Sequence, residues 1–189
     1  MDDPLTAEEK EILLRLARSA MEKGVRGEEL PLVDLETMPA HLTEPGASFV
    51  TLTIHGDLRG CIGALEPSQP LATDVCEHAV AAALDDPRFM PVRADELASI
   101  EIEISRLTMP NKLEYADPED LQARLRPGVD GVILRDGRRR ATFLPQVWEK
   151  LPDKAAFLDH LCAKMGATPD TWRHRHLEVE TYQVEEFHE

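Results

Sequence analysis

The residues best suited to chemistry in this chain lie at positions 58–63, Leu-Arg-Gly-Cys-Ile-Gly. A cysteine reacts as its thiolate, and nearby positive charge or converging backbone N–H groups favour that form. Arg59 stands two residues before Cys61. Gly60 and Gly63 add backbone freedom, which lets a chain come close to a bound group. The spacing therefore suits a site that holds an anion, presents a nucleophile, or does both.

Cys61 admits two interpretations. As a catalytic nucleophile it needs a base that orients and activates the thiol, and His55 or His78 could serve. As a structural residue it would be a small buried hydrophobe beside Ile62. The sequence does not place either histidine near the sulfur, so both interpretations stay open.

The two arginines near this segment also have two interpretations. The guanidinium fork of Arg59 or Arg88 matches a carboxylate or phosphate group of a ligand. Each could instead form an internal ion pair with an acid such as Glu66 or Asp86. If both line one cleft, a small anionic ligand is favoured. The predicted ligand site comprises Arg59, Gly60, Gly63 and Arg88, with Cys61 as the catalytic candidate.

Other patterns that could bind a metal or cofactor are weak. The segment His174-Arg175-His176 could grip a metal in a strand, but it resembles a helix end, where such residues sit in water. The glycines around Cys61 are not a dinucleotide-binding fingerprint, because they do not open a helix after a parallel strand. They are not a phosphate-binding P-loop either, because no Gly-Lys-Ser/Thr follows them. The sequence therefore predicts no metal site and no cofactor.

Charge and composition limit the partners. The chain has 189 residues and a formal net charge of -15, from 36 acidic and 21 basic residues. Phosphate backbones and anionic membrane surfaces repel such a chain, so no nucleic-acid partner is expected. A local exception is the arginine-rich turn at residues 135–140, which is either a solvated hairpin turn or a patch for a phosphate or an acidic partner.

The cysteines and the apolar segments indicate the cellular compartment in which the protein is expected. Cys61, Cys76 and Cys162 are odd in number and far apart, which does not suit a disulfide framework. No signal peptide is recognisable, and no apolar run reaches membrane-spanning length. We expect a cytoplasmic protein with reduced thiols and no membrane association.

The elements that must position these residues can be predicted from periodicity. A helix begins at a capping box, Thr6 to Glu9, and meets a possible stop at Gly24. The segment 25–45 is expected to be an extended loop, and its expected anchors are Leu30, Leu32, Leu35 and Met38. Further elements are expected as a hairpin at 48–65, a helix at 71–84, a strand at 99–107, a short helix from 117 and a hairpin at 129–144. A short helix or turn is expected at 145–151, helices at 153–165 and after 168, and a closing strand at 177–187.

This order lacks regular alternation of strand and helix. An α+β fold with an antiparallel sheet is therefore favoured over a doubly wound parallel sheet. The strand at 99–107 alternates isoleucine with polar residues, which also favours an antiparallel sheet with one buried face. We expect one domain over residues 1–189, with a smaller lobe around 107–145.

The run Leu-Arg-Gly-Cys-Ile-Gly at 58–63 resembles the signature of the AMMECR-type domain, also called AmmeMemoRadiSam system protein A. Agreement continues at Asp-Pro-Arg-Phe (86–89), at Gly-Val-Asp-Gly-Val (128–132), at Thr-Phe-Leu-Pro-Gln-Val-Trp (142–148) and at Leu-Cys-Ala-Lys-Met-Gly (161–166). The resemblance extends from about Phe49 to the C-terminus in the same order. Two departures are the Ala64-Leu65 pair after the signature and Met90 in place of a common proline.

The resemblance implies a fold of two unequal lobes, the larger holding both termini, with a cleft between them near the signature. It also implies association with Memo-like and radical SAM proteins, but no settled biochemical activity. Two hypotheses follow. The chain is an enzyme or enzyme component that binds a small anionic ligand at Arg59, Gly60 and Cys61, or it is a non-catalytic binding module for those partner proteins.

Overall fold

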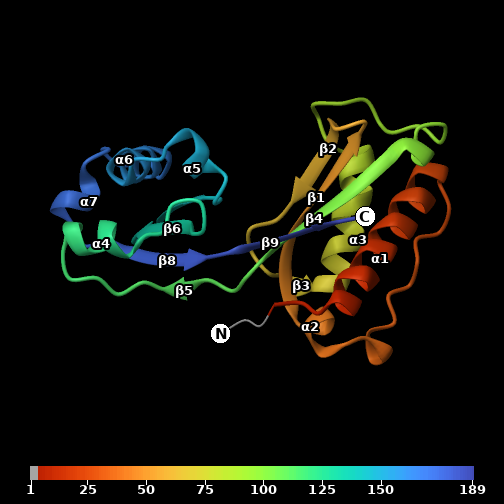
Figure 1. The fold of residues 1–189 in the computed structure, drawn as a ribbon, viewed down its shortest axis with the longest axis horizontal. Helices are drawn as coiled ribbons and strands as arrows, with labels where there is room; N and C mark the ends of the chain where they lie inside the picture. Colours follow the sequence, from red (N-terminus) through yellow and green to blue (C-terminus); the bar gives the residue numbers. More distant parts are fainter. Residues whose placement is uncertain (1–3) are drawn as a thin grey trace. The chain divides into compact units, whose positions relative to one another are not determined.

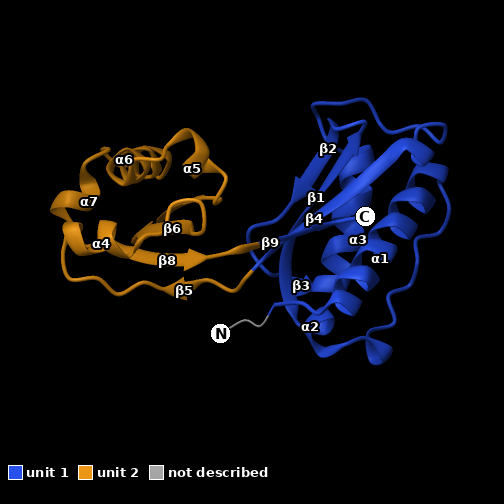
Figure 2. Cartoon of the chain, in the orientation of Figure 1, with its two compact units in different colours: residues 1–107, 185–189 blue, residues 108–184 orange. Residues whose placement is uncertain are grey.

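The computed structural model describes residues 4–189 and divides into two compact units (Figures 1 and 2). Unit 1 takes in the chain up to Leu107 and the final segment Glu185–Glu189, and unit 2 is Thr108–Val184. The larger unit thus holds both ends of the chain, as the resemblance implied. The expected smaller lobe around 107–145 covers only part of unit 2, because a strand formed by residues 178–182 completes the sheet of that unit.

Unit 1 is a mainly antiparallel sheet with helices. Its elements are α1 (Ala7–Arg26), α2 (Ala40–Thr43), β1 (Pro45–Ile54), β2 (Asp57–Gly63), β3 (Gln69–Pro70), α3 (Leu71–Leu84), β4 (Ile100–Leu107) and β9 (Val184–His188), with 3-10 turns at Leu35–Thr37 and Leu97–Ser99 (Figure 1). The strand order is β2-β1-β4-β9, and β3 pairs with one end of β1. Strand β1 runs antiparallel to both β2 and β4.

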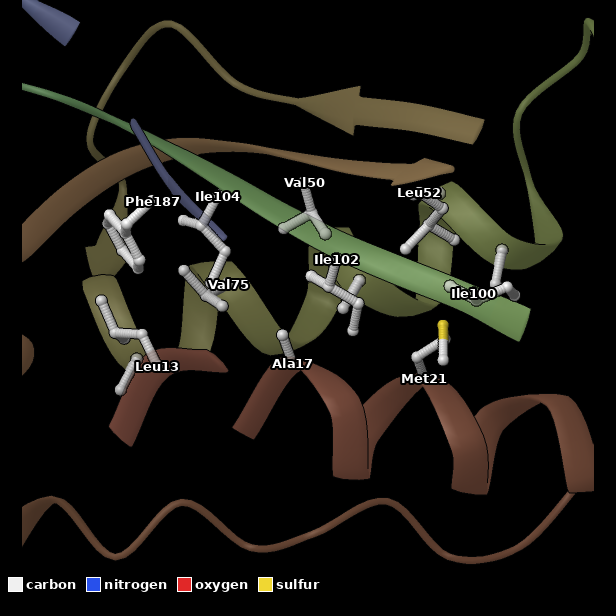
Figure 3. Packing of buried hydrophobic residues seen from close by; sticks show 14 of the residues in the cluster. Leu13, Ala17, Met21, Val50, Leu52, Val75, Ile100, Ile102, Ile104 and Phe187 are labelled. Carbon is white, nitrogen blue, oxygen red and sulfur yellow. The ribbon is translucent and has the colours of Figure 1, made fainter. Parts of the chain in front are cut away.

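The core of unit 1 lies between one face of this sheet and the helices α1 and α3. Helix α1 begins at the expected capping box, in which the Thr6 hydroxyl accepts a hydrogen bond from the Glu9 N–H. The helix continues past Gly24 and ends at Gly27, whose φ of 68° favours glycine. Figure 3 shows its buried stripe, Leu13, Ala17 and Met21, beneath the isoleucines of β4.

The loop before β1 is anchored differently from the expectation. Leu32 is 93% exposed, and Leu30 and Leu35 are also exposed. Of the expected anchors, Met38 does pack against the core, partly buried, together with Val33 and with the fully buried Leu42 on α2. The prediction of Leu30, Leu32 and Leu35 as anchors is therefore wrong. An aperiodic loop gives no signal of which apolar residues face the core.

Unit 2 has its own sheet and its own core. Its elements are β5 (Asn111–Lys112), α4 (Pro118–Arg124), β6 (Gly131–Asp136), β7 (Arg139–Phe143), α5 (Val147–Lys150), α6 (Lys154–Lys164), α7 (Thr171–His174) and β8 (Glu178–Tyr182). The strand order is β5-β8-β6-β7, and all three pairings are antiparallel. In its core Trp148 stacks on Phe157 with ring centroids 3.6 Å apart.

The predicted α+β class is confirmed, since the described residues form helices packed with two separate sheets. The predicted second hairpin is also confirmed as β6 and β7. The expected closing strand at 177–187 is two strands, because the chain leaves one sheet after Tyr182 and joins the other at Val184. None of the described helices combines the length and the apolar character that a membrane crossing requires.

Candidate functional site

A β-bulge at Arg59 sets the orientation of the signature segment. In the β1–β2 ladder Leu52 pairs with Gly60, whereas the next residue, Thr53, pairs with Leu58. Arg59 is therefore the extra residue of the bulge. Because Leu52 is buried, Gly60 faces the helices, and Cys61 lies on the opposite face of the sheet opposite Thr51.

Both glycines of the signature fit against the protein itself. A Cβ atom added at Gly60 would lie 2.0 Å from the carbonyl oxygen of Ala82 on α3. A Cβ added at Gly63 would lie 2.4 Å from the carbonyl oxygen of Ser48 and from the ring of Phe49. The close backbone approach inferred from the sequence thus occurs between β2 and its own neighbours. This packing accounts for both glycines without a ligand.

The segment Asp-Pro-Arg after α3 clamps the free edge of β2 at Cys61. The Cys61 N–H donates to Asp86 Oδ2 at 2.8 Å, and the Arg88 Nη2 donates to the Cys61 carbonyl oxygen at 3.2 Å. Arg88 Nε and Nη2 also donate to the two carboxylate oxygens of Asp86, at 2.9 and 2.7 Å. The clamp gives the Cys61 peptide partners that a neighbouring strand would otherwise supply.

Asp86 is the buried centre of this clamp, with 4% of its surface exposed. Hydrogen bonds from the Arg88 side chain hold the pKa of the Asp86 carboxyl well below its usual range, and the N–H groups of Cys61 and Arg88 add to this effect against the opposing effect of burial. Asp86 is therefore an anion that the fold stabilises strongly.

Arg59 is held inside the unit. Its Nε and Nη2 donate to the two carboxylate oxygens of Glu96 at 2.9 and 3.1 Å. Its Nη1 donates to the Met90 carbonyl at 2.9 Å, and Nη2 also reaches the Pro91 carbonyl at 3.3 Å. The hydrogen bond from Arg59 is the main cause that lowers the pKa of Glu96. The internal ion pair of Arg59 is thus with Glu96, and Asp86, one of the acids considered for this role, pairs with Arg88.

A hydroxyl contacts the Cys61 thiol, and a guanidinium contacts the backbone of the same residue. Thr51 Oγ1 donates to Cys61 Sγ at 3.3 Å. The hydrogen bond to Asp86 is the main cause that raises the pKa of Arg88, and Arg88 Nη2 also donates to the Cys61 carbonyl oxygen at 3.2 Å. Cys61 is partly exposed, and the Arg88 side chain is 54% exposed. A hydroxyl donor at the sulfur and a guanidinium close by are surroundings in which cysteines often react.

The other two cysteines lie in different surroundings. Cys76 on α3 is buried, and burial raises the pKa of its thiol to about 11. Cys162 on α6 is fully buried in the core of unit 2, and burial likewise raises the pKa of its thiol. Both are protonated at neutral pH and shielded from reagents. Cys61 is thus the thiol whose surroundings suit chemistry.

The candidate bases do not join this arrangement. His55 is exposed in the β1–β2 turn with a φ of 54°. The Nδ1 atom of His78 lies 3.1 Å from Asp74 Oδ2, and the same oxygen accepts a hydrogen bond from the buried Ser48 hydroxyl at 2.7 Å. Among residues 4–189 the Cys61 sulfur is contacted by the Thr51 hydroxyl, and neither imidazole forms a hydrogen bond or ion pair with it. Thr51, which does reach it, was not predicted, although its cross-strand position in the predicted hairpin was a usable signal.

The arginine-rich turn and the histidine pair lie in unit 2. The turn joins β6 and β7, where Arg139 pairs with Asp136, Arg135 pairs with Glu180, and Arg138 is exposed. His174 lies at the end of α7, as the sequence indicated. Within the part of the chain that the structure describes, no group of three or more His, Cys, Asp or Glu side chains is arranged to hold a metal ion.

Comparisons with known proteins agree with one another. A family model described as AMMECR1 matches residues 14–187. A protein of Methanothermobacter thermautotrophicus is 40% identical over 188 residues, which cover 98% of this chain and 97% of that relative. A protein of Methanopyrus kandleri is 41% identical over an alignment that covers 100% of this chain and 92% of the relative.

A solved structure shows the same fold. The crystal structure of an uncharacterised protein from Pyrococcus horikoshii matches with a TM-score of 0.78 and 35% sequence identity, over 98% of this chain and 93% of that one. The family model, the relatives and the fold all cover nearly the full length of the chain. The chain therefore belongs to the AMMECR1 family.

Proposed function

We propose that this protein is an enzyme, or a component of one, whose Cys61 thiol acts on a small anionic ligand. The observation that carries the proposal is that the partly exposed Cys61 sulfur accepts a hydrogen bond from the Thr51 hydroxyl, while Arg88 Nη2 donates to the carbonyl oxygen of the same cysteine. A hydroxyl donor and a neighbouring guanidinium are features of cysteine sites that act as nucleophiles. Arg88 is also exposed enough to meet an anion arriving from solvent.

The roles within this site differ from one residue to another. Cys61 would be the nucleophile or thiol ligand, and Arg88 the anion contact. Arg59 would be a positioning residue, because its three nitrogens already have partners inside unit 1. Gly60 and Gly63 would allow the close packing that places Cys61. The proposal includes no cofactor, and the thiol proton would pass to solvent or to the substrate.

Competitive alkylation tests this function. The protein is treated at pH 7 with limiting iodoacetamide or iodoacetate, and the labelled cysteines are quantified by peptide mass spectrometry. We expect Cys61 to react at least about tenfold faster than Cys76, because burial raises the pKa of Cys76 to about 11. The rate with iodoacetate should also saturate, because the anionic reagent would bind beside Arg88 before it reacts.

Two substitutions of the same residue separate charge from structure. Arg88→Lys keeps the positive charge and Arg88→Gln removes it. Both substitutions disturb the pair of hydrogen bonds that Arg88 donates to the Asp86 carboxylate. The ratio of iodoacetate to iodoacetamide rates at Cys61 should fall severalfold in Arg88→Gln and fall less in Arg88→Lys. Labelling of Cys61 no faster than Cys76 in the folded protein would remove the nucleophile role.

A non-catalytic module that docks Memo-like or radical SAM proteins is the second candidate. A specific observation favours it, since Met90 is 81% exposed and Leu58 is 43% exposed, and the Arg59 side chain joins their two segments. Exposed apolar side chains on two segments that are fixed to one another suit the binding of a protein partner. The combined change Leu58→Ser with Met90→Ser should abolish capture of the purified partner, whereas Cys61→Ser should keep it. If Arg138→Glu lost capture and the other variants kept it, the partner would contact the arginine-rich turn instead of Leu58 and Met90.

We also propose a reducing, cytoplasmic setting. All three cysteines are free, and the proposed chemistry needs a free thiol at Cys61. Localisation of a tagged protein after cell fractionation would test this directly.

A further inference from the structure

A cavity of about 220 Å³ lies in unit 2 and is independent of the Cys61 region. One wall is the segment 115–118, before and at the start of α4, and the other is the segment 172–176, at α7 and just beyond it. The volume is below the range of about 300–1,000 Å³ that is typical of sites for drug-sized ligands. Any ligand of this cavity is therefore small.

The charge of the second wall indicates the class of ligand. Four consecutive residues, at positions 173–176, carry a guanidinium or an imidazole, and Asp117 is the one acid among the lining residues. This concentration of donors occurs in a chain whose net charge is -15. Guanidinium and imidazole groups donate hydrogen bonds to oxyanions, so the wall suits a phosphate or carboxylate.

Each arginine of this wall is paired with a carboxylate, and its side chain nevertheless remains exposed to solvent. Arg175 Nη1 and Nη2 each lie 3.1 Å from a carboxylate oxygen of Asp136, yet 62% of the Arg175 side chain is exposed. The Arg173 guanidinium pairs with Asp159 and lies over the Trp172 ring, 4.2 Å from its centroid. Fixing a side chain before binding reduces the entropy that a ligand must overcome.

His176 is fixed in a similar way. Its ring stacks on Tyr115, with centroids 4.3 Å apart and an interplanar angle of 21°. The Tyr115 hydroxyl donates to the Leu177 carbonyl at 2.9 Å and accepts from the Leu177 N–H at 2.8 Å, so the aromatic platform is anchored to the backbone. The imidazole itself is exposed, and its ring nitrogens can therefore meet a ligand.

We propose that this cavity binds the phosphate or carboxylate group of a small metabolite, with Arg175 and His176 as the direct contacts. Arg173 adds positive charge, and Tyr115 positions the imidazole. Asp117 opposes highly charged ligands and favours a single oxyanion group. The site is a second binding site, and it does not depend on the function proposed for Cys61.

A titration with inorganic phosphate, followed by backbone amide NMR, tests this proposal. Sodium chloride is replaced by phosphate at constant ionic strength and pH, and acetate is titrated in a parallel arm. We expect saturable shifts centred on the amides of residues 115–117 and 172–176 in at least one arm. The anion that binds more tightly identifies the preferred group.

Two matched variants make the result specific. Arg175→Gln removes a charge at the cavity, and Arg138→Gln removes the same charge from an exposed position on the β6–β7 turn. The apparent affinity should fall at least about tenfold in Arg175→Gln and stay unchanged in Arg138→Gln, with both variants folded by circular dichroism. Equal weakening in the two variants, shifts spread over arginines in general, or no saturable shift with either anion would overturn the proposal.

Discussion

Arg59 in unit 1 and Arg175 in unit 2 each form a bidentate ion pair with a carboxylate. The two arginines differ in what surrounds the rest of the side chain. The Arg59 side chain is 17% exposed, and its Nη1 donates to a backbone carbonyl. The Arg175 side chain is 62% exposed and lines a cavity. The first arginine joins two segments of the unit, whereas the second presents charge to solvent.

The same contrast holds for the regions around these arginines. In the Cys61 region, glycines, Asp86 and Arg59 make contacts within unit 1, and the groups left to meet a ligand are the Cys61 sulfur and Arg88. In the cavity of unit 2, Arg175 is paired with Asp136, and its largely exposed side chain is among those that line the open volume. The recognisable motif at residues 58–63 thus serves mostly for packing, whereas the inconspicuous run at residues 173–176 lines a concave surface. The variants that follow test this distinction.

The largest effect is expected from Gly60→Ala. The added Cβ would lie 2.0 Å from the Ala82 carbonyl oxygen, which is backbone and cannot rotate away. We expect unit 1 to lose about 3 kcal/mol of unfolding free energy, measured by urea titration with circular dichroism. In the control Gly128→Ala no atom lies within 4 Å, and only the positive φ of 76° is strained, at a cost of about 1 kcal/mol. A smaller loss for Gly60→Ala than for the control would show that the motif glycine is not needed for packing.

A smaller loss is expected from Asp86→Asn, which removes the charge of the clamp. The hydrogen bonds that Asp86 accepts from Arg88 and from the Cys61 N–H should make the change cost about 2 kcal/mol at neutral pH. The control Asp85→Asn alters the exposed neighbouring acid and should be close to neutral.

The pH dependence of this difference has a definite sign. The folded-state pKa of Asp86 lies below the ordinary carboxyl value, so its stabilisation is fully present above that value and is lost as pH falls toward the folded-state pKa. The difference between wild type and Asp86→Asn should therefore be constant above about pH 5 and shrink in acid. A difference that grows as the pH falls would contradict the assignment of Asp86 as a stabilised anion.

Arg59→Gln and Arg88→Gln separate a positioning arginine from a contact arginine. Arg59→Gln should lower the unfolding free energy by about 1 kcal/mol, because its ion pair with Glu96 is only partly buried. It should leave the ratio of iodoacetate to iodoacetamide rates at Cys61 unchanged, whereas Arg88→Gln should lower that ratio. Equal changes of the ratio in both variants would mean that the two arginines share one role.

The sequence predicted those parts of the fold that depend on near neighbours. The capping box at Thr6, the first hairpin and the alternating strand at 99–107 all follow from spacing within a few residues, and each is present. The strand break at Gln183 was missed because two successive strands with similar composition do not reveal that they join different sheets.

The site was harder to predict for the same reason. Arg59 pairs with Glu96, 37 positions away, and in a chain with 36 acids the pattern cannot select the partner. The bulge that rotates Cys61 toward Thr51 was foreseen only as a distortion near two glycines. The cavity at Tyr115 and His176 joins segments about sixty residues apart, so its concave shape has no local signature.

The smallest effect on stability is expected at His176, where two substitutions separate stacking from ligand contact. His176→Phe keeps an aromatic ring on Tyr115 and removes both ring nitrogens, whereas His176→Ala removes the ring. His176→Ala should cost about 0.5–1 kcal/mol, and His176→Phe should be close to neutral, both measured by urea unfolding followed through tryptophan fluorescence, since Trp148 and Trp172 lie in unit 2. Both variants should weaken phosphate or acetate binding by a similar factor, because both lack the imidazole donors. If His176→Phe retained wild-type affinity, the imidazole would be only a stacking partner, and the direct contact would pass to Arg175 alone.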